Sequence, residues 1–353
     1  MRQLSLFRIP EHLSRLSEAG DPLEALSTIV DFEDFRLVLS RGLNYADGSR
    51  GGRPPYDPVL MFKVLILAAQ NNVSDEKMEF LIRDRLSWMR FLGLELGDPM
   101  PDANTIRLFR ERLSQGKTLN RLFQRFDHAL SRAGYAPRGG QIVDATLVSA
   151  PRQRLKDAEK QAIKEEKTAG SIWPDQPHKA AQKDVDARWT VKFKKGQNGH
   201  RDIAIPSYGY KSHVVIDRRY RFIRSGETTH AARHDGALLQ EIVTTHNTSN
   251  AVWADSAYRS KANEEFLQQQ GLSSHIHRKK PKGKPMPQHI ARGNATRSRI
   301  RSCVEHVFAE QKHRMGLSIR TIGINRAKAK ITLANIAYNM KRFVFLERRR
   351  AIG

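Results

Sequence analysis

Three acidic residues of this 353-residue chain stand where a lone charge is unexpected. Asp144 interrupts the β-branched stretch 141–148, Asp255 ends the apolar stretch 251–255, and Glu305 lies among the apolar residues of a helical pattern. A buried carboxylate costs free energy unless it is paired or binds a cation. Each acid alone is more simply a helix cap or a structural ion-pair partner. Together they favour two-metal chemistry, in which Mg²⁺ ions activate water or a 3′-hydroxyl against a phosphodiester and stabilise the leaving oxygen.

The pattern around these acids predicts an α/β domain with a mixed sheet. The first three expected strands can form a meander, whereas the later ones alternate with helices and therefore favour parallel pairing. Asp255 then falls at the end of a strand, where α/β folds present functional groups. Strands are expected at 141–148, 210–217, 222–229, 251–255 and 274–277, with flanking helices at 235–246, at 260–270 and from residue 295 onward.

Residues 1–135 have a different pattern, which is typical of an all-α domain. Asp57, followed by a proline, and Ser74, followed by two acids, are helix-start signals before apolar segments. A later helix carries Arg107 and Arg110 beside an apolar stripe, so it could read DNA or be an ordinary amphipathic helix. The sequence therefore predicts a helical DNA-binding or dimerisation domain at 1–135.

A stretch rich in turn residues separates this region from a catalytic domain expected at 136–353. That domain contains a polar, basic insertion at about 152–200 with little core-forming pattern. Trp173 and Trp189 of the insertion could engage DNA by stacking while neighbouring lysines contact phosphates. A flexible surface loop is the alternative for residues 152–183.

The charge of the chain points to a polyanion as its partner. Lys and Arg number 61 against 37 Asp and Glu, a formal net charge of +24. Residues 266–304 contain no acid and nine Lys or Arg, including Lys279 and Lys280, and 312–353 contain eleven against one acid. Single-sign tracts of this length favour contact with nucleic acid, with a disordered basic tail as the alternative.

Composition excludes several other classes of protein. The longest apolar run, at 59–69, is interrupted by a lysine and is too short to span a bilayer. Residues 1–10 lack the apolar core of a signal peptide, so we expect a cytoplasmic protein. Cys303 is the single cysteine, which excludes a disulfide framework and a cysteine-rich zinc module.

Several motifs together resemble those of a known family. Asp144 lies in a Val-Asp-Ala-Thr strand, and Asp255 begins an Asp-x-Ala-Tyr element. Arg301, Glu305 and Lys312 have the spacing of a Tyr-x2-Arg-x3-Glu-x6-Lys signature. Further matches are Gly-Arg-Pro-Pro-Tyr-Asp-Pro at 52–58, Phe-Leu-Gly-Leu at 91–94, Pro-Asp-Ala-Asn-Thr-Ile at 101–106, Asp-x-Asp-Ala-Arg-Trp at 184–189 and Gly-Tyr-Lys-x-His at 209–213. Over nearly its whole length the chain resembles DDE transposases of bacterial insertion sequences, specifically the insertion sequence five family.

This resemblance implies an RNase H-like catalytic core preceded by the helical domain. It makes Asp144, Asp255 and Glu305 the catalytic acids and the ligands of Mg²⁺, for which Mn²⁺ could substitute. Arg301 and Lys312 would hold phosphates near the scissile bond; a surface ion-pair ladder is the alternative for these two. The signature's tyrosine falls at a serine, Ser298. The 49 residues between the second and third acids leave no room for the β-domain that some related transposases insert there.

The resemblance also implies the partners. We expect double-stranded DNA, as terminal inverted repeats and as target, bound by a homodimer or higher oligomer in a synaptic complex in the bacterial cytoplasm and nucleoid, without a membrane. Two alternatives stay open: a simple Mg²⁺-dependent nuclease, and a catalytically idle, transposase-derived repressor. The expected DNA-binding residues are Arg301, Lys312, Lys211, Arg107, Arg110, Lys279 and Lys280.

Overall fold

The computed structural model describes residues 8–44, 54–194, 203–281 and 283–352. Three residues named for the family motif or the basic tract lie outside these described residues: Gly52, Arg53 and Lys282. None of the described helices combines the length and the apolar character needed to cross a bilayer.

The chain divides into two compact units. The first unit comprises Met1–Leu130 with Thr332–Gly353, and the second comprises Ser131–Ile331. The first boundary lies close to the break expected after residue 135. The C-terminal residues, which the sequence placed in the catalytic domain, group with the N-terminal helices instead. The reason is helix α16 (Ile324–Ile352), which begins in the second unit and ends in the first.

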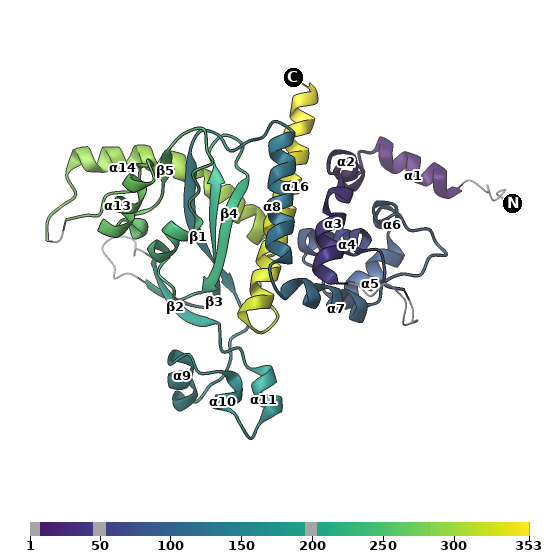
Figure 1. Cartoon of the computed structure of the whole chain (residues 1–353), viewed down its shortest axis with the longest axis horizontal. Helices are drawn as coiled ribbons and strands as arrows, with labels where there is room; N and C mark the ends of the chain where they lie inside the picture. Colours follow the sequence, from purple (N-terminus) through teal and green to yellow (C-terminus); the bar gives the residue numbers. More distant parts are fainter. Residues whose placement is uncertain (1–7, 45–53, 195–202, 282, 353) are drawn as a thin grey trace. The chain divides into compact units, whose positions relative to one another are not determined.

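The first unit is built from helices whose starts follow the expected local signals. The Asp57 carboxylate accepts the backbone N–H of Val59 at 2.8 Å, and the Ser74 hydroxyl accepts that of Lys77 at 3.4 Å. These contacts satisfy donors that a helix start leaves free. The elements before α16 are α1 (Arg8–Glu18), α2 (Pro22–Ile29), η1 (Phe32–Phe35), α3 (Arg36–Leu43), α4 (Pro58–Asn71), α5 (Asp75–Asp84), α6 (Leu86–Leu92), α7 (Ala103–Ser114) and α8 (Thr118–Arg132) (Figure 1).

Helix α4 is the centre of the core of this unit. Nine of its residues are buried, from Val59 to Ala69, so it is apolar nearly all round. Phe62 of α4 packs against Phe35, with 4.9 Å between the ring centroids, and Phe35 in turn meets Phe126 of α8. The structure therefore explains the longest apolar run of the sequence as a buried helix.

The second unit contains a six-stranded mixed sheet, as expected. Strand β1 is antiparallel to β3, and β3 is antiparallel to both β2 and β4, whereas β1, β5 and β6 run parallel. The order is β2-β3-β1-β5-β6, with β4 also paired to β3, so β1, β3 and β4 form the predicted meander. The bounds are β1 (Gln141–Ser149), β2 (Arg188–Lys194), β3 (Ile203–Asp217), β4 (Ile223–His230), β5 (Ala251–Trp253) and β6 (Ser273–Ser274).

Helices cover the sheet and connect its strands. Between β4 and β6 lie η2 (Asp235–Leu238), α12 (Leu239–Ile242), η3 (Ser256–Tyr258) and α13 (Lys261–Gln269), which are shorter than the helices expected there. After β6 come α14 (Gln288–Arg301), α15 (Cys303–Ala309) and the π-helical turn η4 (Glu310–Arg314).

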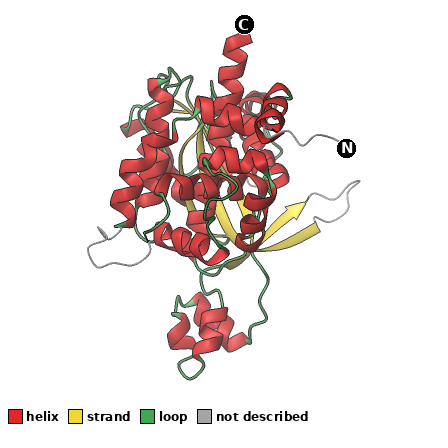
Figure 2. Ribbon diagram, turned by 90° about the vertical axis from the view of Figure 1, so that its right-hand side faces the viewer, coloured by secondary structure: helices red, strands yellow, loops and turns green. Residues whose placement is uncertain are grey.

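The insertion after β1 is folded and is not a loop. It forms three helices, α9 (Asp157–Lys164), α10 (Ala169–Ile172) and α11 (Pro177–Gln182), which stand apart from the sheet in Figure 1 and Figure 2. Trp173 is only 4% exposed there, and its indole N–H donates to Glu159 at 2.8 Å. Trp173 therefore belongs to the small core of the insertion and is not available for stacking on DNA. Trp189, on β2, is 47% exposed.

Candidate active site

Asp144 is positioned by the alternation of β1. Side chains of successive strand residues point to opposite faces of a sheet. Val143 points into the core that β1 forms with Leu239 of α12 and Leu267 of α13. Asp144 therefore points to the other face, and α14 and α15 are in contact with the same strand. Its main-chain neighbour Ala145 donates a backbone N–H to Asp144 Oδ1 at 2.8 Å.

Asp255 is brought beside Asp144 by the parallel register of two strands. Ile142 of β1 pairs with Trp253 of β5, so residues two positions further along come level with each other. Adjacent strands lie about 4.8 Å apart, which places the two carboxylates next to each other. The backbone N–H of Ala257 donates to Asp255 Oδ1 at 2.8 Å and fixes this carboxylate at the start of η3.

Glu305 and Arg301 come from the two helices that follow β6. Helix α14 ends at Arg301, and α15 begins two residues later at Cys303. The Arg301 guanidinium hydrogen-bonds through Nη1 to Asp144 Oδ2, and its Nη2 lies 3.6 Å from Glu305 Oε1. Arg301 thus joins two of the three acids. The Glu305 side chain is 58% exposed, so it is free to turn within the site.

The three acids share one cleft, which we call the acid cleft. Its volume is about 620 Å³, and it is bordered by β1, the start of η3 and the α14–η4 segment. Asp235, which the sequence left as either an auxiliary residue or a helix cap, also lies there. The cleft is lined by Asp144, Ala145, Thr146, Lys192, Asp235, Asp255, Arg301, Glu305, Phe308, Ala309, Lys312 and His313.

The acid cleft is electrostatically strained at Asp144. Burial raises the pKa of Asp144 from 3.8 to about 6; Arg301 lowers it, while the charges of Asp255 and Glu305 raise it. Nearby, the Tyr258 hydroxyl is fully buried and has no hydrogen-bond partner among the described residues. Burial raises the pKa of Tyr258 well above its ordinary value, and Asp144, Asp235 and Asp255 add to this effect. These carboxylates repel one another, and the buried Tyr258 hydroxyl beside them has no hydrogen-bond partner among the described residues.

The donor set fits a hard divalent cation. Carboxylate oxygens are the ligands that Mg²⁺ and Mn²⁺ prefer, and a cation would relieve the repulsion around Asp144. No three His, Cys, Asp or Glu side chains of the described residues stand close enough to hold one ion as they lie. Arg301 engages Asp144 Oδ2 and is the group that a cation on this oxygen would displace.

Two lysines also line the acid cleft. Lys312 lies on the π-helical turn η4, and Lys192 extends from β2, which pairs with the first half of β3. Local π-helical geometry is found often at functional sites. Lys312 was expected from the signature spacing. Lys192 was not, because nothing in the sequence marked 188–194 as a strand that reaches the acids.

Other predicted basic residues already have partners within the structure. Lys211 donates to Asp235 Oδ1 and to the carbonyl of Arg233, both at 2.7 Å, and its side chain is only 12% exposed. Arg110 of α7 makes two hydrogen bonds to the Asp75 carboxylate, at 2.6 and 2.5 Å. Both cations hold elements together in the described structure, and DNA contact at these two residues stays a prediction.

The remaining predicted basic residues lie on exposed surface. Arg107 is exposed on α7 and donates to Asn104 of the preceding turn at 2.7 Å. Lys279 and Lys280 are exposed in the segment between β6 and α14 and do not line the acid cleft. For these three residues DNA contact stays a prediction.

The Asp-x-Asp-Ala-Arg-Trp element has a structural task. Asp184 is 3% exposed and accepts the Tyr210 hydroxyl at 2.7 Å, which ties the end of the insertion to β3. Asp186 accepts the backbone N–H of Ile324 at 2.8 Å, at the start of α16. The motif therefore fixes the insertion and the first turn of α16 to the sheet.

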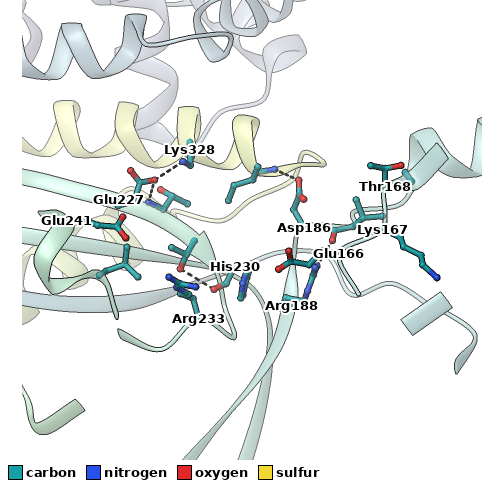
Figure 3. A pocket seen from close by; sticks show the side chains of 16 residues that line it. Glu166, Lys167, Thr168, Asp186, Arg188, Glu227, His230, Arg233, Glu241 and Lys328 are labelled. Atoms are coloured by element: carbon teal, nitrogen blue, oxygen red, sulfur yellow. Dashed lines mark hydrogen bonds and ion pairs between the residues drawn. The ribbon is translucent and has the colours of Figure 1, made fainter. Parts of the chain in front are cut away.

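A second cleft of about 630 Å³ has none of the three acids in its lining. Figure 3 shows its charged residues. There Lys328 pairs with Glu227 at 2.8 Å, and Asp186 makes its contact with α16. In this cleft Lys328 and Glu227 neutralise each other, whereas Asp144 shares its arginine with Glu305.

Comparison with known families identifies the two parts of the chain. Residues 135–340 match the family described as "Transposase DDE domain", which is more than half of the chain. Residues 11–112 match the family described as "Transposase domain (DUF772)". No solved structure matches the chain.

Proposed function

The chain belongs to the DDE-domain transposases of insertion sequences, and from this premise we propose that it binds the terminal inverted repeats of its element, cleaves DNA at the element ends and joins them to target DNA. A DDE domain implies dependence on a divalent metal and DNA as the partner. The finer steps rest on one observation: Asp144, Asp255 and Glu305 line a single cleft together with Arg301 and Lys312.

We propose Mg²⁺ as the metal, with Mn²⁺ as a substitute, held by Asp144 and Asp255 and completed by Glu305. When bound, the metal activates the attacking oxygen and stabilises the leaving oxygen of the phosphodiester. Asp144 is held in place by the β1 backbone and Asp255 by the N–H of Ala257. The two carboxylates are thus preorganised, whereas the exposed Glu305 can adjust when DNA enters.

Arg301 and Lys312 would position the substrate. Both line the acid cleft and carry charge of the sign that a phosphodiester needs. A metal held by Asp144 would compete with Arg301 for Oδ2 and would leave the guanidinium available for a phosphate oxygen. Metal and DNA binding would therefore support each other through this one side chain.

The first unit would recognise the repeats and contribute to an assembly of two or more chains. Two ends must be brought together for transposition, so we expect at least a dimer in the bacterial nucleoid. Arg107 is the exposed arginine on α7 that is best placed for a contact with DNA. Membership in the narrower insertion sequence five family stays a prediction.

A strand-transfer assay tests the proposal. The full chain is incubated with a labelled duplex that ends in the element's repeat, a supercoiled target plasmid, and Mg²⁺ or Mn²⁺. We expect labelled product covalently joined to the plasmid. Cleavage without joining would instead identify a nuclease, and binding without cleavage would identify a repressor.

A further inference from the structure

Another cavity, distinct from the two clefts described above, shares two lysines with the acid cleft. We call it the serine cleft: its volume is about 510 Å³, and its lining includes Ser149, Ser207 and Ser318. Lys192 and Lys312 line both cavities and so mark the place where they meet. The two clefts are therefore neighbours: the acids line one of them, and the two lysines line both.

The charge at this junction is not compensated. No carboxylate lines the serine cleft, and within the described ranges neither Lys192 nor Lys312 has an ion pair or a hydrogen bond to its ammonium group. Burial lowers the pKa of Lys312, the nearby charge of Lys192 lowers it further, and Glu305 acts in the opposite direction. Two ammonium groups held near each other in this way favour an anion between them.

The rest of the serine cleft fits a nucleotide better than a simple anion. Three hydroxyl groups can donate or accept hydrogen bonds, while Leu147 and Leu317 provide apolar surface for a sugar or base. The wall is fixed in advance, because the N–H of Ile319 donates to the carbonyl of Ser149 at 2.9 Å. A pocket that is already formed loses little entropy when it binds.

We propose that the serine cleft binds the nucleotide that flanks the scissile phosphate, and that Lys192 and Lys312 hold a backbone phosphate where the two clefts meet. This inference rests on the proposed function. It makes Lys192 a positioning residue of the DNA substrate, and it assigns strand β2 a part in substrate binding.

Binding measurements on the full chain test the assignment. The affinity for a short fluorescent duplex is measured by anisotropy in Ca²⁺ across a salt series. Lys192→Gln should weaken binding about fivefold and reduce the slope of log affinity against log salt by about 1, as loss of one phosphate contact does. Lys261→Gln, which removes an exposed charge on α13 outside both clefts, should leave affinity and slope unchanged.

A second variant tests the cavity apart from its charge. Ser318→Phe fills the serine cleft and should weaken duplex binding while the salt slope stays as in the wild type. Acetylation of surface lysines, read by mass spectrometry, gives a measurement on the unaltered chain. The duplex should protect Lys192 and Lys312 and should leave Lys261 reactive.

The outcomes separate this inference from the proposed function. If the wild type binds no duplex, the proposed function fails. If it binds and Lys192→Gln behaves as Lys261→Gln does, only the junction assignment is overturned. If inorganic phosphate alone protects both lysines as well as the duplex does, and Ser318→Phe has no effect, the cavity binds a simple anion and the nucleotide assignment is wrong.

Discussion

The first unit and the acid cleft of the second unit differ in how their charges are matched. In the first unit, arginines are matched by carboxylates on other elements: Arg90 of α6 binds Asp21 at the start of α2 at 2.6 Å, and Arg110 of α7 binds Asp75 of α5. In these two pairs each cation has its own acid, and each pair joins two elements. Such pairs hold a fold together and leave little charge for a ligand.

In the acid cleft the same residue types are left incompletely matched. Asp144 and Asp255 stand next to each other with one arginine, and that arginine is shared with Glu305. Lys192 and Lys312 line the same cleft as these acids, and on the side of the serine cleft no carboxylate lies beside them in the described structure. The comparison shows that the sign and number of charges indicate a ligand site less well than whether each charge is neutralised by a neighbour. Charges that are not neutralised by neighbours therefore indicate a ligand-binding site.

The largest effect is expected when one of the incompletely matched acids, Asp144, is replaced. Asp144→Asn should reduce DNA cleavage and strand transfer at least about a thousandfold, because this carboxylate is expected to hold the metal. Duplex binding should remain close to that of the wild type. Cleavage of a labelled repeat-ended duplex gives the rate, and anisotropy gives the binding. Cleavage at the normal rate would contradict the assignment of the acid.

The converse experiment removes a matched charge. Arg110→Ala should lower the free energy of unfolding by about 2 kcal/mol, because it leaves the half-buried Asp75 without its bidentate partner. Urea denaturation measures this, and the double variant with Asp75→Ala should cost less than the sum of the two single changes. If Arg110→Ala instead weakens DNA binding while the stability is unchanged, the DNA contact predicted from sequence is right.

A third experiment concerns Arg301, which pairs with Asp144 but is shared with Glu305. Arg301→Gln should raise the affinity for Mn²⁺ in the absence of DNA by about tenfold, since it removes a cation that competes for Asp144 Oδ2. Titration followed by electron paramagnetic resonance measures free Mn²⁺ directly. Arg314→Gln is the matched control, because Arg314 pairs with Glu310 on the same segment and does not line the acid cleft. Equal affinities in both variants would show that Arg301 does not compete.

The smallest expected effect is on stability and depends on pH. The pKa of Asp144 is raised from 3.8 to about 6, so the folded chain binds a proton here that the unfolded chain has lost. Between these two values the free energy of unfolding contributed by this group falls as pH rises, and it stays low above about 6. At neutral pH, metal-free Asp144→Asn should therefore melt a few degrees above the wild type. This difference should shrink as pH falls from about 6 toward 4, as thermal denaturation can check. A difference that does not vary with pH would contradict the raised pKa.

The same pKa has a consequence for metal binding. A metal must displace the proton of Asp144, so the affinity for Mn²⁺ should fall as pH drops below about 6. Titrations at several pH values, on wild type and on the Asp144→Asn variant, separate this group from the other acids.

Sequence predicted those features that depend on local pattern. Asp57 and Ser74 start helices because a short polar side chain satisfies backbone donors within its own turn, and such signals need no tertiary information. Asp144 was predicted because a charged residue within a β-branched stretch stands out in the sequence, whatever the fold. Five of the six described strands were expected from their apolar and β-branched runs, whereas β2 was not.

Features that depend on contacts between distant residues were missed. Lys211 and Arg110 look like free cations in sequence, and only the folded chain shows Asp235 and Asp75 at their ends. Lys192 lines the acid cleft because β2 pairs with β3. The polar sequence of this segment did not predict that pairing. Trp173 is buried by a small helical cluster whose core is too small to give a periodic signal.

The register between β1 and β5 also bears on how the gene can change. Asp144 and Asp255 are level because each follows a paired strand residue by two positions, so loss or gain of a single codon after Trp253 would turn the second acid toward the opposite face. The much longer interval between these acids contains three whole helices, and both acids still line one cleft. We therefore expect that the effect of an insertion in this chain depends more on where it falls relative to a strand than on its size.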